Sequence, residues 1–379
     1  MLFLLFSAGF VLLLYIHFGI AHYMLNDMRG HTSSELDMGY IRIEDYFGQS
    51  FRAKVRDWMS LPSTSDSTAN LRVIDRGVEK VFVVGSTTYP ADRNESGVLI
   101  IEGDFNCGVA CEFERELMIR GNANIGAGSH LQAIAVDGEL ELLHNVVVRR
   151  WIDAGGAVKI GADATIGSKV CSRKSILFEP GAEAASLYAP EIVTEGRAET
   201  IAKLTVEQRE VVMIPHAANM KDRKSNGYDP KKLFAMGGGS YLYNGDLKLS
   251  APLHLRAPLI VKGDIHTVRE NFFEQDLKAS GSIRIGELSV LKGNLISDKN
   301  IEVGTDTYFQ GIIHAAGELI LKNGVRGLRD TTPVVAYSGG TLTVESNVVI
   351  HGKLASAARV TAVSTPISWL KAPQTGEEA

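Results

Sequence analysis

Ten histidines are the side chains in this sequence best suited to general acid and base catalysis near neutral pH. Two of them, His17 and His22, lie in or beside a long apolar segment at the start of the chain. Five more are spread along the remaining sequence: His144, His254, His266, His314 and His351. None of these is paired with a carboxylate in a recognisable motif, so no histidine is predicted to act as a catalytic base.

Two aspartates, Asp246 and Asp264, have a spacing that could build a site, because they lie 18 residues apart in a repeated sequence. Clustered with arginine or lysine, such carboxylates could bind calcium or act on a polysaccharide. The same position continues as Ser282, Asn300 and Glu318. Asp, Ser and Asn directly after glycine are typical of turns, where their side chains hydrogen-bond the backbone. The column is therefore interpreted as turn chemistry.

The three cysteines, Cys107, Cys111 and Cys171, are too few for a disulfide framework and lack the CxxC spacing of a zinc site. The sequence also contains no P-loop, GxGxxG, HExxH or GxSxG motif. We therefore predict no catalytic, cofactor-binding or metal-binding residue and no cofactor.

A repeat of 18 residues organises the chain from about residue 80 onward. In the second half its markers are Gly245, Gly263, Gly281, Lys299 and Gly317, each followed two residues later by Leu247, Ile265, Ile283, Ile301 and Leu319. In the first half they are Gly103, Gly121, Gly138 and Gly156, followed by Phe105, Ala123, Leu140 and Val158. Equal spacing of an aliphatic column is typical of stacked repeats that share one core.

Within each unit apolar and polar residues alternate, as in SIRIG and NIEVG, which is the period of a β-strand. The sequence therefore predicts a parallel β-helix with 18-residue coils, in which glycine supplies the positive φ of the turns. Two blocks are expected, over residues 80–195 and 241–363.

The first 25 residues contain no Asp, Glu, Lys or Arg. As a helix, residues 2–25 would be about 36 Å long, enough to cross a hydrocarbon core of about 30 Å. The sequence predicts a transmembrane helix over residues 1–25, with a cleaved signal peptide as the alternative, since Gly19 and Ala21 are small. Arg29 and Arg42 favour a cytoplasmic location for the rest of the chain.

Three further segments complete the predicted organisation. Residues 26–79 form a juxtamembrane amphipathic segment and linker, whose helix could lie on a membrane surface or cover the following domain. This helix is indicated by Phe47, Phe51, Val55 and Trp58 at helical spacing. Residues 196–240 are an insertion with a short helix over 196–212 and a solvated basic loop, whose basic residues are Lys221, Arg223, Lys224, Lys231 and Lys232. Residues 364–379 are a tail.

The glycine-punctuated stretches LIIEGDF, LMIRGNANIG, LIVKGDI and SIRIGELSVLKGNLISDKNIEVG resemble the bactofilins, a family of bacterial polymer-forming cytoskeletal proteins. The resemblance covers about 240 of the 379 residues. It implies a right-handed β-helix that assembles end to end without nucleotide, often at the inner membrane, as a scaffold for cell-shape and envelope enzymes.

We therefore predict a non-enzymatic, membrane-anchored scaffold of the bacterial inner membrane that organises the cell envelope. Its expected partners are the membrane, further copies bound through the β-helix ends, and envelope proteins; the net charge of −5 gives no reason to expect nucleic acid. The last coil, residues 341–354, is expected to expose an end. Two enzymes stay as alternatives. The stretch IGADATIGSKV, residues 160–170, resembles left-handed hexapeptide-repeat acyltransferases, and the aspartate column allows a β-helical carbohydrate-active enzyme.

Overall fold

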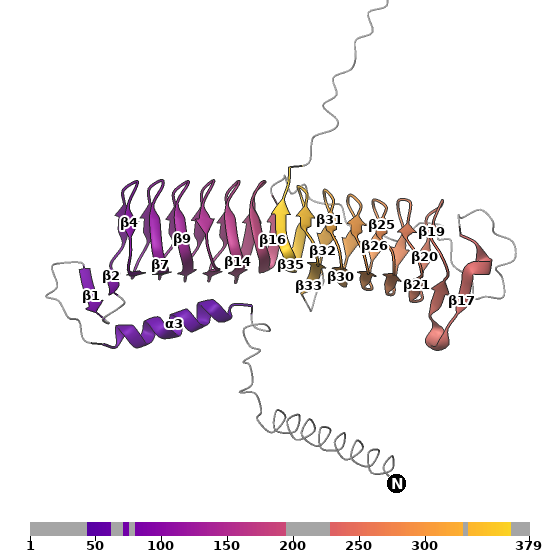
Figure 1. The fold of residues 1–379 in the computed structure, drawn as a ribbon, viewed down its shortest axis with the longest axis horizontal. Helices are drawn as coiled ribbons and strands as arrows, with labels where there is room; N and C mark the ends of the chain where they lie inside the picture. Colours follow the sequence, from indigo (N-terminus) through magenta and orange to yellow (C-terminus); the bar gives the residue numbers. More distant parts are fainter. Residues whose placement is uncertain (1–43, 62–70, 76–79, 195–227, 329–332, 365–379) are drawn as a thin grey trace, which may run out of the picture. The chain divides into compact units, whose positions relative to one another are not determined.

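The computed structural model describes residues 44–61, 71–75, 80–194, 228–328 and 333–364 (Figure 1). From Phe47 onward these residues belong to one compact unit. They form a parallel β-solenoid of about 14 turns and one α-helix, α3 (Tyr46–Met59). The solenoid has two blocks of seven coils each. Every coil has three strands, and the strands stack into three faces that we name I, II and III in chain order.

The faces of block 1 are built from strands that pair in parallel from coil to coil. Face I contains β2 (Lys80–Val84), β5 (Val98–Ile101), β7 (Glu112–Ile119), β9 (His130–Val136), β12 (Ile152–Ala154), β14 (Thr165–Ser172) and β16 (Glu183–Thr194). Face II contains β3 (Thr87–Tyr89), β6 (Phe105–Cys107), β8 (Ala123–Ile125), β10 (Leu140–Leu142), β13 (Val158–Ile160), β15 (Ser175–Phe178) and the end of β16. Face III contains β4 (Asn94–Glu95), β11 (Val147–Val148) and the first residues of β7, β9, β14 and β16.

Block 2 repeats this arrangement. Face I contains β18 (Tyr241–Tyr243), β21 (Leu259–Val261), β24 (Leu277–Ala279), β27 (Leu295–Ser297), β30 (Ile312–Ala315), β33 (Val334–Ser338) and the middle of β35 (Val349–Ala362). Face II contains β19 (Leu247–Lys248), β22 (Ile265–His266), β25 (Ile283–Ile285), β28 (Ile301–Val303), β31 (Leu319–Leu321), β34 (Leu342–Val344) and the end of β35. Face III contains β20 (His254–Leu255), β23 (Phe272–Phe273), β26 (Val290–Leu291), β29 (Tyr308–Phe309), β32 (Arg326–Gly327) and the start of β35.

The predicted parallel β-helix and its register are confirmed. Ile283 lies opposite Ile301 in the ladder between β25 and β28, and both are buried in the interior. In block 1, Leu140 lies between Ala123 and Val158, as the 18-residue spacing indicates. Strands of two to four residues suffice for this fold because every coil buries its apolar side chains against the coils above and below it.

The role predicted for the repeat glycines is wrong. At Gly281 a Cβ atom would lie 2.1 Å from Oδ1 of Asp264 and 2.7 Å from the backbone of Gly263, so glycine is required there by close approach between coils. The positive φ of each coil is instead at the corner between faces II and III, and mostly on other residue types. These left-handed residues include Ala110, Asn145, Asp163, Leu288, Asp306 and Asn347.

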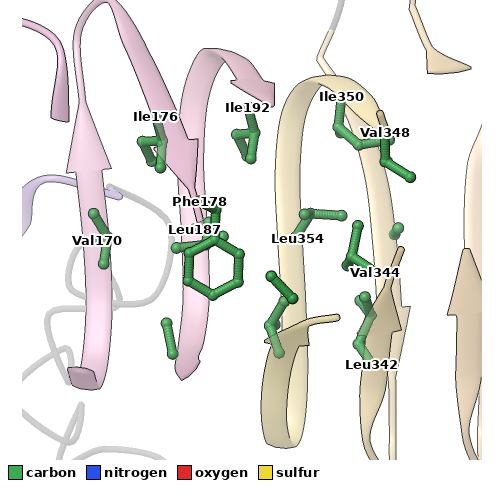
Figure 2. Close-up of a cluster of buried hydrophobic side chains, with 14 of the residues drawn as sticks. Val170, Ile176, Phe178, Leu187, Ile192, Leu342, Val344, Val348, Ile350 and Leu354 are labelled. Atoms are coloured by element: carbon green, nitrogen blue, oxygen red, sulfur yellow. The ribbon is translucent and has the colours of Figure 1, made fainter. Parts of the chain in front are cut away.

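The two blocks are joined at their C-terminal coils. β16 pairs with β35 in antiparallel fashion, with Leu187 opposite Leu354 on face I. Face II of block 1 meets face III of block 2 at Ile192 and Ile350. Faces III and II meet in the same way on the other side, as a two-fold axis through face I requires. Figure 2 shows the side chains of both last coils filling one continuous interior.

Helix α3 packs on the outer side of face I of block 1 (Figure 1). Phe51, Val55 and Trp58 are buried there against side chains that include Val98 and Ala133. Of the two predicted roles of this helix, covering the β-helical domain is confirmed, although α3 covers a side of the solenoid rather than an open end.

An arginine anchors α3 to the solenoid. The guanidinium of Arg52 donates to Oδ1 of Asp137 at 2.8 Å and to Oδ1 of Asp153 at 2.9 Å. Burial by itself would lower the pKa of Arg52, but the two carboxylates outweigh it and the pKa is raised. Gly48 lies directly over Asp153, since a Cβ atom there would be 1.8 Å from Oδ2. This close approach allows the buried carboxylate to face the helix.

The predicted fold class, which joined the β-helix to an N-terminal transmembrane helix, is wrong. The part of the chain that the structure describes is all-β with one helix, and contains no helix that is long and apolar enough to cross a membrane. α3 has 14 residues, and its apolar side chains are used in packing on face I. Residues 1–25, 196–227 and 365–379, on which further predictions fall, lie outside the described residues.

Candidate functional site

The histidines singled out in the sequence are not brought together. His254 lies on face III, His266 on face II and His314 on face I of block 2. His254 is buried and its Nε2 contacts Oε1 of Glu274, while the ring of His314 stacks on Tyr337 with centroids 5.2 Å apart. Side chains on three different faces cannot act on one substrate, so these histidines do not form a shared site.

The aspartate column serves the turns, as predicted. Oδ1 of Asp246 accepts the N–H of Asp264 at 3.0 Å, and Oδ1 of Asp264 accepts the N–H of Ser282 at 2.8 Å. The same bond joins Asn300 to the N–H of Glu318, one coil further on. Each side chain therefore replaces a backbone hydrogen bond at the corner between faces I and II. Across the described residues, no three His, Cys, Asp or Glu side chains are grouped so that they could hold a metal ion.

The cysteines are free and buried in the interior or beneath α3's face of block 1. Burial is the main cause that raises the pKa of the Cys107 thiol to about 12, with a further contribution from Cys111. A thiol with so high a pKa is almost entirely protonated at neutral pH and is a poor nucleophile. These residues therefore pack as small apolar side chains.

The features that distinguish this solenoid are its ends. The predicted exposed end at residues 341–354 is wrong, because β35 is paired along its length with β16. The N–H of Val348 donates to Oγ1 of Thr194 at 3.0 Å, and Arg359 forms an ion pair of 2.7 Å with Glu183. Both C-terminal coils are thus covered within the chain, and only the N-terminal coil of each block remains as an end.

The N-terminal end of block 1 is only partly covered. β1 (Leu71–Asp75) pairs in antiparallel fashion with β2, and so covers face I. β3 and β4 have no strand partner on their outer edge among the described residues. A hollow of about 470 Å³ lies at this end and is lined by residues that include Leu71, Phe82 and Tyr89. One coil further in, the equivalent interior side chains are fully buried.

The aromatic ring of Tyr89 forms part of this open end. It lies 5.4 Å from the ring of Phe105 in the next coil, between centroids. Burial, followed by the negative charge of Glu95, raises the pKa of Tyr89 to about 12. The phenol is therefore neutral at physiological pH, and the end presents an apolar surface with unpaired strand edges beside it.

The N-terminal end of block 2 has the same construction. β17 (Leu233–Ala235) pairs in antiparallel fashion with β18 on face I. β19 and β20 have no partner on their outer edges in the described part of the chain. Short 3₁₀ turns, Pro230–Lys232 and Gly237–Gly239, flank β17. The sequence analysis missed both capping strands, β1 and β17, because they lie in segments whose composition indicates linker or loop.

Comparison with known proteins identifies no relative. No family model, no curated protein and no solved structure matches the chain.

Proposed function

We propose that this protein is a scaffold that assembles with further copies of itself through the N-terminal ends of its two blocks. The observation that carries the proposal is the unequal treatment of the ends. The C-terminal coils are fully paired with each other, whereas each N-terminal coil is capped on one face and open on the other two. Open strand edges are templates for pairing with another chain.

The junction between the blocks supports the proposal, because it shows how two ends of this fold combine. There, strands from two coils pair and apolar interiors merge, so that Leu187, Ile192 and Leu354 are fully buried. The hollow beside Leu71 and Tyr89 leaves comparable interior surface accessible. The resemblance of the repeats to bactofilins is a second support for a polymer-forming scaffold, with envelope proteins as clients. The inner-membrane localisation and the absence of enzymatic activity stay predictions.

The experiment is sedimentation velocity and electron microscopy of the full-length protein with and without changes at the end of block 1. Leu71 is 41% exposed and lines the hollow, so Leu71→Lys places a charge there. Thr88→Pro acts on the edge itself. Thr87 and Gly108 show that β3 bonds to the next coil at residues 87 and 89, so the N–H of Thr88 points to the open edge.

Both variants should reduce the large species of the wild-type protein while leaving its circular dichroism unchanged. The matched control is Ile320→Lys, a half-exposed position on face II in the middle of block 2, which should assemble like the wild type. A wild-type protein that remains monomeric at high concentration refutes the proposal. Equal loss of assembly in the Ile320 control would show that the ends are not the contacts.

A further inference from the structure

Face I of block 2 exposes a column of apolar side chains. Phe234 of β17 is 51% exposed and lies opposite Leu242 of β18, so both are on the outer side of the sheet. The column continues through Ile260 and Ile296 to Tyr337 by parallel pairing. Ile312, which is 47% exposed, lies beside it. Two of the most exposed large apolar side chains of the described residues are thus on this one face.

The same face of block 1 is covered. Its outward side chains, which include Val98, Ile100 and Ala135, are completely buried beneath α3. The junction pairs face I with face I, and Tyr188 of block 1 lies opposite Lys353 of block 2. The two faces therefore form one continuous sheet surface. An amphipathic helix covers its first half.

The order of elements along the chain is the same in front of both blocks. Before block 1 come α3, then the antiparallel capping strand β1, then the first coil. Before block 2 come residues 196–212, for which the sequence predicts a short helix, then the antiparallel capping strand β17, then the first coil. These residues lie outside the described part of the chain. In block 1 the segment at this position binds face I.

The length and pattern of residues 196–212 suit the uncovered face. The segment connects Thr194, at the junction, with Tyr228, which packs at the N-terminal end of block 2. Six coil steps separate β35 from β18, which is about 29 Å, and 17 helical residues extend about 26 Å. At 100° per residue Ile201, Leu204 and Val211 fall within one apolar arc about 100° wide, as in a helix that packs on one face.

We propose that residues 196–212 bind face I of block 2 in the same chain, as α3 binds face I of block 1. The segment covers Ile296, Ile312 and Tyr337 with Ile201, Leu204 and Val211. This inference is independent of the proposed assembly, because face I is a side of the solenoid and not an end.

The test is the rate at which a maleimide reagent labels a cysteine introduced as Ile312→Cys in the full-length protein. The native cysteines are buried and serve as an internal check that the fold is intact. The matched control is Val109→Cys at the end of block 1, which is 52% exposed and lies on no part of face I. Cys at 312 should be labelled at least about tenfold more slowly than Cys at 109, the factor that 1.4 kcal/mol of binding free energy provides.

A second variant assigns the cover. Adding Leu204→Asp and Val211→Asp should raise the labelling rate at 312 to that of the control, without a change in circular dichroism. Equally fast labelling at both positions in the unmodified segment overturns the proposal. Slow labelling that is lost on dilution assigns the cover to a second copy, and slow labelling that survives both dilution and the double substitution assigns it to another partner; either result also overturns it.

Discussion

Shortening one leucine on each side of the junction tests whether the two blocks form a single cooperative unit. Leu187 and Leu354 lie opposite each other in the ladder between β16 and β35, and both are fully buried. A buried Leu→Ala exchange removes apolar contacts and leaves a cavity, so each single variant should lose about 3 kcal/mol of unfolding free energy. Because the two side chains share one space, the double variant should lose about 1 kcal/mol less than the sum.

A distant pair provides the control. Leu277 is buried on β24, four coil steps from β35, or about 19 Å. Combining Leu187→Ala with Leu277→Ala should give additive losses to within about 0.5 kcal/mol, since the residues share no neighbour.

Two probes of guanidinium unfolding report on different parts of the molecule. Trp58 and Trp151 are buried between α3 and face I of block 1, so with Trp369 replaced by Phe the fluorescence follows block 1. Circular dichroism follows the strands of both blocks. The two curves should coincide before the junction is weakened and separate in the Leu187, Leu354 double variant. Additive losses at the junction with coincident curves throughout would refute the end-to-end joining of the blocks.

Three further predictions follow from single residues. Ile301→Asp should unfold the solenoid or lower its melting temperature strongly, because Ile301 faces Ile283 in a dry interior and a carboxylate there has no partner; an unchanged melting curve would contradict the register. Arg52→Met should cost about 2–3 kcal/mol, below the usual 3–5 for a broken buried pair because Arg173 remains 3.6 Å from Asp153, and Asp153→Leu added to it should restore much of the loss in fluorescence-monitored unfolding. Tyr89 ionises at about 10 in the unfolded chain and about 12 in the folded one, so the unfolded state loses its proton first and stability falls as pH rises through this window; Tyr89→Phe should flatten that fall in denaturation curves, and an unchanged slope would exclude it.

The solenoid could be predicted from sequence because its signal repeats. An interior column such as Leu247, Ile265 and Ile283 appears at a fixed interval, and each coil imposes the same demand on the next. The amphipathic helix was identified for a similar reason, since Phe51, Val55 and Trp58 recur at the helical period. Periodicity reports on contacts between neighbours in a regular array.

The features of the ends could not be predicted in this way. Antiparallel pairing of β16 with β35 joins residues about 150 or more positions apart, and each of these strands reads like any other coil. The capping strands β1 and β17 occur once each and have no period. The glycine column was misinterpreted because close approach between backbones and positive φ both select glycine, and only the geometry at Gly281 distinguishes the two causes.

The junction also determines what happens as the chain is synthesised. Block 1 is complete at Thr194, yet its last strand has to wait for Val348 and the residues after it, 154 positions later, before its edge is paired. During translation at about 5–20 residues per second, that edge is open for roughly ten to thirty seconds. The final strand of the polypeptide therefore closes the middle of the solenoid rather than one of its extremities. A ribosome that stops before β35 releases two unpaired ends at once.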